Sequence, residues 1–155
     1  MKREPHILFE DNHLLVLDKP TMLLTQDAPS GGDSLESLAR SFIKERDEKP
    51  GKVYLHAVHR LDKEAFGVVL FAKTSKALTR LHKQMQSGGF SKHYLSLVEG
   101  VMDQEHGVWE DWLTHGDRRA LVGKREGAKR AKLRFDLLEI RGDQSLLSIH
   151  LETGR

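Results

Sequence analysis

The chain has 155 residues, of which 38% are hydrophobic and 31% charged. This composition is typical of a folded domain and excludes collagen-like, mucin-like and wholly disordered chains. The longest apolar runs, such as residues 68–72, have the length of a strand and fall far short of the roughly 20 residues that span a bilayer. We therefore expect a single domain in a cytoplasmic protein, with no secretory signal at the N-terminus and no association with a membrane.

Cysteine is absent, which excludes disulfides, thiol nucleophiles, iron–sulfur clusters and every zinc site with a cysteine ligand. The net charge of +2 is too small to indicate a partner. The charges are nevertheless unevenly distributed. Residues 115–134, which we call the basic segment, contain eight lysines and arginines but only two acidic residues, and so have a net charge of +6.

A hairpin is predicted near the N-terminus. Residues 7–9 and 14–17 are apolar, and the turn-prone Asp-Asn pair at 11–12 separates them. The second apolar run ends before the Lys-Pro pair at 19–20.

The first helix is predicted from its cap and its apolar stripe. Asp33 can cap this helix, because Glu36 follows three residues later in the reciprocal arrangement of a capping box. A Lys-Pro-Gly sequence at 49–51 breaks the helical pattern. Before that break, apolar residues recur at helical spacing, at Leu35, Leu38, Ala39, Phe42 and Ile43.

A strand and a second helix follow an extended run that begins at residues 53–55. Residues 68–72 are uninterrupted apolar and mostly β-branched or aromatic, which predicts a strand buried on both faces. Thr74 or Ser75 can cap the helix, which ends near the glycine pair at 88–89. Its predicted apolar face comprises Leu78, Leu81, His82 and Met85.

The rest of the chain is predicted to be mostly β-strand. Alternating or β-rich segments occupy residues 94–98, 107–113, 132–138 and 145–151. Because strands and helices do not alternate regularly, we expect an α+β fold with a mixed or antiparallel sheet and helices packed on it, rather than a doubly wound fold.

The stretch most able to carry chemistry is His59-Arg60-Leu61-Asp62, which lies between two apolar runs. A carboxylate flanked by a guanidinium and an imidazole can act as a nucleophile or a general base. The same residues can instead form a structural ion pair between Arg60 and Asp62 that holds a loop. The spacing alone leaves both interpretations open.

Four blocks of the sequence resemble, in the same order, the motifs of the RluA-type family of RNA pseudouridine synthases. These blocks are residues 15–20, which end in Lys-Pro; His59-Arg60-Leu61-Asp62 with residues 67–73; residues 92–100, which contain Lys-His-Tyr; and residues 151–155, which contain Thr-Gly-Arg. The resemblance extends over nearly the whole chain.

The resemblance implies that uridine is isomerised to pseudouridine in structured RNA, either rRNA or tRNA. In this reaction the N1 glycosidic bond breaks, the uracil rotates, and C5 reattaches to the same ribose, without a cofactor or a metal. Asp62 matches the family's catalytic carboxylate, which either bonds to the sugar carbon or abstracts a proton. By the same resemblance, Tyr94 and Arg155 are further catalytic residues, and the substrate-binding residues are His59, Arg60 and Leu61.

The expected environment of Asp62 follows from its charge. Burial raises the pKa of a carboxyl by up to about 3 to 5 units above its usual value near 3.9, so a buried Asp62 needs a nearby cation to stay ionised. The resemblance assigns that role to Arg155. An exposed chain end remains the alternative for Arg155, and a half-buried strand residue with its hydroxyl at the rim remains the alternative for Tyr94.

Two features depart from the family pattern. Phe66 stands where a serine is usual, which changes the contacts of the loop. Family members also continue past Thr-Gly-Arg through a stretch similar to His-Gln-Ile-Arg. We therefore expect residues 1–155 to be a catalytic domain that is incomplete at its C-terminus and has no N-terminal module of the S4 type.

A uridine cannot react while it is stacked, so we expect the target to be flipped out of a single-stranded loop, at a cost of a few kcal/mol. RNA is the expected partner, and the protein is expected to be a monomer. The basic segment would hold RNA phosphates, although a solvated loop of the same composition is the alternative. The candidate RNA-binding residues are Arg118, Arg119, Lys124, Arg125, Lys129 and Arg130.

Two other functions remain open. One is a non-catalytic RNA-binding relative of the same fold. The other is a carboxylate-dependent glycoside hydrolase, for which Glu64 is the nearest second acid. A metal site at His56 and His59 is not expected, because residues three apart on an extended run point to opposite faces and no third ligand is near in sequence.

Overall fold

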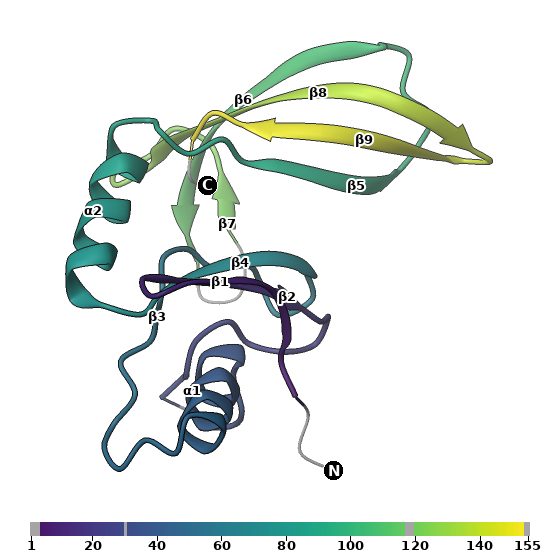
Figure 1. Cartoon of the computed structure of the whole chain (residues 1–155). Helices are drawn as coiled ribbons and strands as arrows, with labels where there is room; N and C mark the ends of the chain where they lie inside the picture. Colours follow the sequence, from purple (N-terminus) through teal and green to yellow (C-terminus); the bar gives the residue numbers. More distant parts are fainter. Residues whose placement is uncertain (1–3, 30, 117–119, 154–155) are drawn as a thin grey trace. The chain divides into compact units, whose positions relative to one another are not determined.

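The computed structural model describes residues 4–29, 31–116 and 120–153. The chain divides into two compact units, an N-terminal unit over Met1–Gly89 and a C-terminal unit over Phe90–Arg155. Both units are built around antiparallel sheets (Figure 1). The α+β prediction is therefore confirmed, whereas the folding of both units as one domain stays a prediction.

The N-terminal unit contains a four-stranded sheet in the order β1-β2-β4-β3. The predicted hairpin is confirmed, because β1 and β2 pair antiparallel and the Asp11 carboxylate accepts the backbone N–H groups of His13 and Leu14 at 2.7 and 2.6 Å. The strands are β1 (His6–Glu10), β2 (Leu14–Lys19), β3 (His56–Ala57) and β4 (Gly67–Ala72), and the helices are α1 (Leu35–Arg46) and α2 (Ser75–Gln86).

The core of this unit lies between the sheet and α1. Alternate residues of a strand point to one face, and residues three or four apart share one face of a helix. The predicted apolar stripe of α1 is confirmed, with its first, fifth and ninth residues buried and Leu38 and Phe42 packed at the margin. The most buried members of the core are Leu15, Leu17, Leu35, Ala39, Ile43, Leu55, Val69 and Phe71.

The prediction that Asp33 caps α1 is wrong by one residue. Ser34 is the N-cap: its Oγ accepts the backbone N–H of Ser37 at 3.0 Å, and its own backbone N–H donates to Ser37 Oγ at 3.0 Å. Glu36, the predicted partner in the box, is buried instead. Its carboxylate accepts the backbone N–H of Ala57 at 2.9 Å and pairs with Arg40, so it joins α1 to β3.

The prediction that residues 68–72 are buried on both faces holds only in part, because Ala72 is fully buried but Val68 on the same face is not. Val69 and Phe71 are fully buried, but Val68 on the opposite face is 57% exposed. The reason is that β4 pairs antiparallel with both β2 and β3, and an antiparallel sheet can be covered on one face and open on the other.

The second helix begins as predicted but has a more exposed surface than expected. Thr74 is the N-cap and accepts the backbone N–H of Ala77 at 3.2 Å. None of the residues 75–86, all of which the structure describes, is buried, and His82 of the predicted apolar face is exposed. No helix in the described part of the chain is long and apolar enough to cross a membrane.

The C-terminal unit is a five-stranded antiparallel sheet in the order β5-β9-β8-β6-β7. The four strands predicted here are confirmed. β7 was not predicted because three residues inside a charged segment give no periodic signal. The strands are β5 (His93–Glu99), β6 (His106–His115), β7 (Ala120–Val122), β8 (Lys129–Arg141) and β9 (Gln144–Leu151).

An aromatic contact organises the core of this second sheet. The rings of Trp109 and Phe135 lie with centroids 4.5 Å apart, and Phe135 and Leu147 are fully buried. Gly107 lies opposite Phe135 on the neighbouring strand, and a Cβ at this position would be 2.7 Å from the phenyl ring. Glycine is therefore required there by the close approach of the ring.

The capping box can be tested with a matched pair of alanine variants. Ser34→Ala removes the acceptor for the backbone N–H of Ser37, and we expect it to lower the free energy of unfolding by about 1 kcal/mol. Asp33→Ala should change it by less than about 0.5 kcal/mol, because this exposed side chain makes no hydrogen bond with other described residues. Urea unfolding measures both, and a larger loss for Asp33→Ala would contradict the assigned cap.

Candidate functional site

The candidate catalytic residue lies in the loop between β3 and β4, which we call the Asp62 loop and define as residues 58–66. Asp62 and Arg60 are exposed, whereas His59 and Leu61 are half-buried. The ion pair between Arg60 and Asp62 that the sequence allowed is not among the ion pairs of the described residues. The Asp62 carboxylate is thus exposed, whereas the side chains of His59 and Leu61 in the same loop are partly buried in the unit.

A buried lysine at the end of β2 holds the backbone beside Asp62. Lys19 is 0% exposed, and its Nζ donates to the carbonyls of Leu23, Pro20 and Lys63 at 2.6, 3.1 and 3.2 Å. Burial lowers the pKa of Lys19, and the negative charges of Glu64 and Asp62 partly offset this. The Lys-Pro block is therefore an anchor for the loop.

Two threonines in the segment after Lys19 bind the same loop. Thr21 Oγ1 donates to the carbonyl of Glu64 at 2.7 Å. Thr25 Oγ1 donates to the carbonyl of Leu61 at 2.8 Å and accepts the Leu61 backbone N–H at 3.1 Å. With Lys19, these contacts fix the carbonyls on both sides of Asp62 while its side chain remains exposed.

His59 connects the beginning of the loop to the sheet. Its Nε2 accepts the backbone N–H of Leu70 at 3.2 Å, and the backbone N–H of Val58 donates to the carbonyl of Leu70 at 2.8 Å. An imidazole nitrogen that accepts a hydrogen bond carries no proton. The geometry therefore gives His59 a structural contact with β4, whereas its role in substrate binding stays a prediction.

The loop returns to β4 through a tight turn that exposes an aromatic ring. The backbone N–H of Ala65 donates to the carbonyl of Asp62 at 3.2 Å, and Gly67 has a φ of 121°, a conformation that favours glycine. Phe66 is between these two residues, and its side chain is 78% exposed. An unusually exposed phenyl ring thus follows Asp62 by four positions.

The other two predicted catalytic residues belong to the C-terminal unit or lie outside the described residues. Tyr94 is on β5 opposite Ile149 of β9 and is half-buried. Arg155 lies outside the described residues, so its role stays a prediction. The Thr-Gly-Arg block begins in contact with β8, because Thr153 Oγ1 accepts the backbone N–H of Lys132 at 3.0 Å.

Where it is described, the basic segment contains β7 and the beginning of β8, which lie on opposite sides of β6. β7 and β8 both pair with β6, and Arg118 and Arg119 lie outside the described residues. Lys124 lies over the ring of Trp112, 5.8 Å from its centroid. Arg130 binds the carboxylate of Glu110 through two hydrogen bonds of 2.7 and 2.8 Å. Lys124, Arg125 and Lys129 are exposed.

The contacts of Lys19, Thr21 and Thr25 with the loop could not be found from the sequence. The Lys-Pro block marks Lys19 as unusual, but its partner Lys63 lies 44 residues away. Nothing in the pattern around the threonines distinguishes them from surface residues. Within the described ranges, no group of three or more His, Asp or Glu side chains is arranged to hold a metal.

Comparison with protein families gives a match over most of the chain. The model described as RNA pseudouridylate synthase matches residues 13–155. The chain is 32% identical over 149 residues to ribosomal large subunit pseudouridine synthase D of Nitrosomonas europaea, a match that covers 96% of this chain and 43% of that protein. It is 35% identical over 154 residues to ribosomal large subunit pseudouridine synthase C of Escherichia coli K12, with 96% and 46% covered.

Solved structures resemble the fold. Human RNA pseudouridylate synthase domain containing 4 superposes with a TM-score of 0.79 at 21% identity, over 97% of this chain and 60% of that one. Human RNA pseudouridylate synthase domain containing 1 gives 0.77 at 17% identity, over 100% and 62%. The chain spans slightly less than half the length of the curated relatives described above.

The anchoring role of Lys19 can be tested by replacing it with an apolar residue of similar length. Lys19→Met leaves three carbonyls without their donor, and each buried unsatisfied group costs about 1–3 kcal/mol. We expect the free energy of unfolding to fall by at least about 3 kcal/mol in urea titrations.

Lys63→Met provides the control for this variant. It removes an exposed lysine side chain but keeps the carbonyl that Lys19 binds, so the stability should change by less than about 0.5 kcal/mol. Equal losses in the two variants would show that the hydrogen bonds from Lys19 do not hold the loop.

Proposed function

The chain belongs to the RNA pseudouridylate synthase family, and on this premise we propose that the protein isomerises uridine to pseudouridine in RNA. The observation that carries the proposal is the Asp62 loop. An exposed carboxylate stands in a His-Arg-Leu-Asp motif, inside the matched region, on a backbone that Lys19, Thr21 and Thr25 hold from one side. A fixed backbone with an accessible carboxylate suits a group that must meet a reacting sugar in one orientation.

The proposed reaction rearranges one nucleotide and consumes nothing. The bond between N1 and C1′ breaks, a bond between C5 and C1′ forms, the proton on C5 leaves, and N1 gains a proton. Asp62 assists the departure of the base, either by bonding to C1′ or by taking a proton from the sugar. Both routes conserve atoms and electrons without an oxidant or a reductant.

The remaining motif residues receive supporting roles in this proposal. The exposed Arg60 is suited to bind a phosphate next to the target uridine, while His59 and Leu61 keep the loop in place. Tyr94 as a ring that stacks on uracil, and Arg155 as the cation paired with Asp62, are assignments that rest on the family motifs.

Ribosomal RNA is the substrate class we propose. The curated relatives described above are named as synthases of the large ribosomal subunit, which favours rRNA over the tRNA alternative. The target would be a uridine in a single-stranded loop, because flipping costs least where the base is unpaired. The exposed cations Lys124, Arg125 and Lys129 would contact phosphates, whereas Arg130 is already paired with Glu110.

Phe66 is proposed as a stacking residue for an RNA base next to the target uridine. Its ring is 78% exposed and leaves the Asp62 loop immediately before β4. Aromatic rings on which unpaired bases stack are a common means of holding single-stranded RNA. The replacement of the usual serine by phenylalanine would therefore add a contact to RNA rather than disturb the loop.

The catalytic assignment can be tested with two neighbouring carboxylates. Asp62→Asn should lower the rate of pseudouridine formation in rRNA by at least about 100-fold, the lower end of general acid–base effects. Glu64→Gln removes the nearest other acid, and its rate should stay within about threefold of wild type. Isomer formation is measured by nucleoside chromatography of the digested RNA.

The outcomes separate the competing functions. Equal product from Asp62→Asn and wild type would exclude Asp62 from the mechanism. If intact wild-type protein binds RNA but forms no pseudouridine in rRNA or tRNA pools, the chain is a binding module of this fold.

The role of Phe66 can be tested with a matched change elsewhere on the same unit. Phe66→Ser should weaken binding of a single-stranded RNA by about 1–3 kcal/mol, the range for loss of one stacked base. Phe9→Ser makes the same change at an exposed ring on β1 and should leave the Kd unchanged. Fluorescence anisotropy reports both values, and equal losses would argue against stacking at Phe66.

A further inference from the structure

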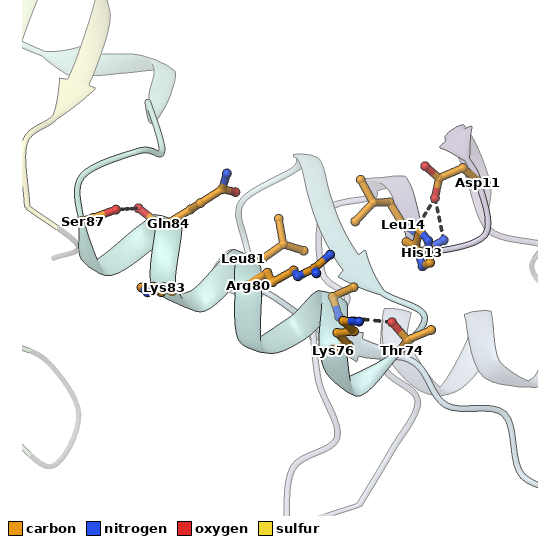
Figure 2. A pocket seen from close by; sticks show the side chains of 11 residues that line it. Asp11, His13, Leu14, Thr74, Lys76, Arg80, Leu81, Lys83, Gln84 and Ser87 are labelled. Atoms are coloured by element: carbon orange, nitrogen blue, oxygen red, sulfur yellow. Dashed lines mark hydrogen bonds between the residues drawn. The ribbon is translucent and has the colours of Figure 1, made fainter.

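The N-terminal unit has a groove to which none of the roles described above is assigned. It runs between α2 and the turn that joins β1 to β2, and its volume is about 590 Å³ (Figure 2). We call it the α2 groove. Its walls come from Asp11 to Leu14 on one side and from the helix between Lys76 and Ser87 on the other. Every lining residue belongs to the N-terminal unit.

Three cations of α2 line this groove along a single face of the helix. Lys76, Arg80 and Lys83 are spaced by four and three residues, which places them one above another. At 1.5 Å per residue, the three span roughly 10 Å along the helix axis.

These cations have no acidic partner in the part of the chain that the structure describes. Elsewhere in the unit, Lys73 and Arg46 both bind Glu10, at 2.7 and 2.6 Å. By contrast, none of the ion pairs between described residues includes a cation of α2, and the helix contains no Asp or Glu. Like charges three or four residues apart destabilise a helix by about 0.2–0.5 kcal/mol per pair. A bound polyanion would remove that repulsion.

One acidic side chain lines the groove, and its position limits its effect. The Asp11 carboxylate is at the turn, where it accepts the backbone N–H groups of His13 and Leu14. These hydrogen bonds lower the pKa of Asp11, so it remains charged. Arg80 extends from α2 toward this turn (Figure 2). Three cations against one carboxylate leave the groove positive.

The floor of the groove is apolar. Leu14, Ala77 and Leu81 line it between the cations and the turn. A ligand that combines a row of negative charges with flat or apolar surface matches this lining, because phosphates can meet the cations while sugars and bases cover the floor. Free phosphate or an acidic peptide would use the charges but leave the floor open to water.

We propose that the α2 groove binds the sugar–phosphate backbone of a single-stranded segment of the substrate RNA, separate from the target uridine. This inference rests on the proposed function, because it takes RNA as the partner. It adds a second contact that does not read sequence, since lysine and arginine meet phosphates that every nucleotide carries.

The experiment compares two pairs of lysine substitutions in the protein. Lys76→Gln with Lys83→Gln removes two cations of the α2 groove. Lys44→Gln with Lys52→Gln removes two exposed cations of the same unit that lie outside the groove and are unpaired among the described residues. Anisotropy of a fluorescein-labelled single-stranded RNA gives the Kd at several salt concentrations.

The groove pair should reduce the dependence of log Kd on log salt by about 1.4, at roughly 0.7 per phosphate contact on a single strand. Its loss of affinity between about 50 and 200 mM salt should then be about sevenfold smaller than that of wild type. The control pair should keep the wild-type slope. Lys76→Arg with Lys83→Arg, which preserves the charge, should also keep it.

Two other outcomes would overturn the proposal that the α2 groove binds RNA. If the groove pair keeps the wild-type slope and affinity, the groove does not hold RNA. If the control pair loses as much as the groove pair, the effect comes from net charge rather than from this site. Because anisotropy measures binding without turnover, absence of isomerisation would overturn the proposed function and leave the binding result interpretable.

Discussion

The buried ammonium of Lys19 is the constraint on which the candidate site depends. A charged group without partners is costly to remove from water, and an ammonium has three hydrogen-bond donors. Lys19 meets this requirement with three backbone carbonyls, two from the segment that follows it and one from Lys63 beside Asp62. The need to satisfy one charge therefore draws together two motifs that are more than 40 residues apart. The Lys-Pro block and the His-Arg-Leu-Asp block act as one structural element.

In this arrangement the backbone of the Asp62 loop is held by hydrogen bonds while its carboxylate stays exposed. From the sequence we expected that Asp62, if buried, would need a nearby cation to stay ionised. In the described structure the Asp62 side chain is exposed, so water solvates the carboxylate while hydrogen bonds from Lys19, Thr21 and Thr25 hold the backbone. The hydrogen-bonded main chain fixes the position of the loop, and the exposed side chain leaves the Asp62 carboxylate accessible to a substrate. A substrate that covers Asp62 would then displace the water that solvates its carboxylate.

The sequence predicted features that depend on neighbours along the chain and missed features that depend on distant contacts. The apolar stripe of α1 and the β1–β2 hairpin follow from local periodicity, and both were found. The prediction of the cap missed by one residue because aspartate and serine are both good caps. The hydrogen bond of 2.5 Å from Ser34 Oγ to the Asp27 carboxylate, which favours Ser34, is not visible in a local pattern. Val68 resembles a core residue until the sheet is known to be open on that face. Lysine is usually exposed, so the burial of Lys19 had no sequence signal beyond the family motif.

The distribution of positive charge shows why a charge count along the sequence is an incomplete guide to binding. The basic segment has the highest net charge, yet Arg130 is bound to Glu110, and Lys132 and Arg134 are both bound to Glu152. Two carboxylates, Glu110 on β6 and Glu152 just after β9, offset most of the charge of these three cations. The cations of α2 are fewer and belong to a longer stretch, residues 65–98, which contains five lysines and arginines and no acidic residue. Helical spacing places them on one face without an acid, and it is this unpaired charge that a polyanion can use.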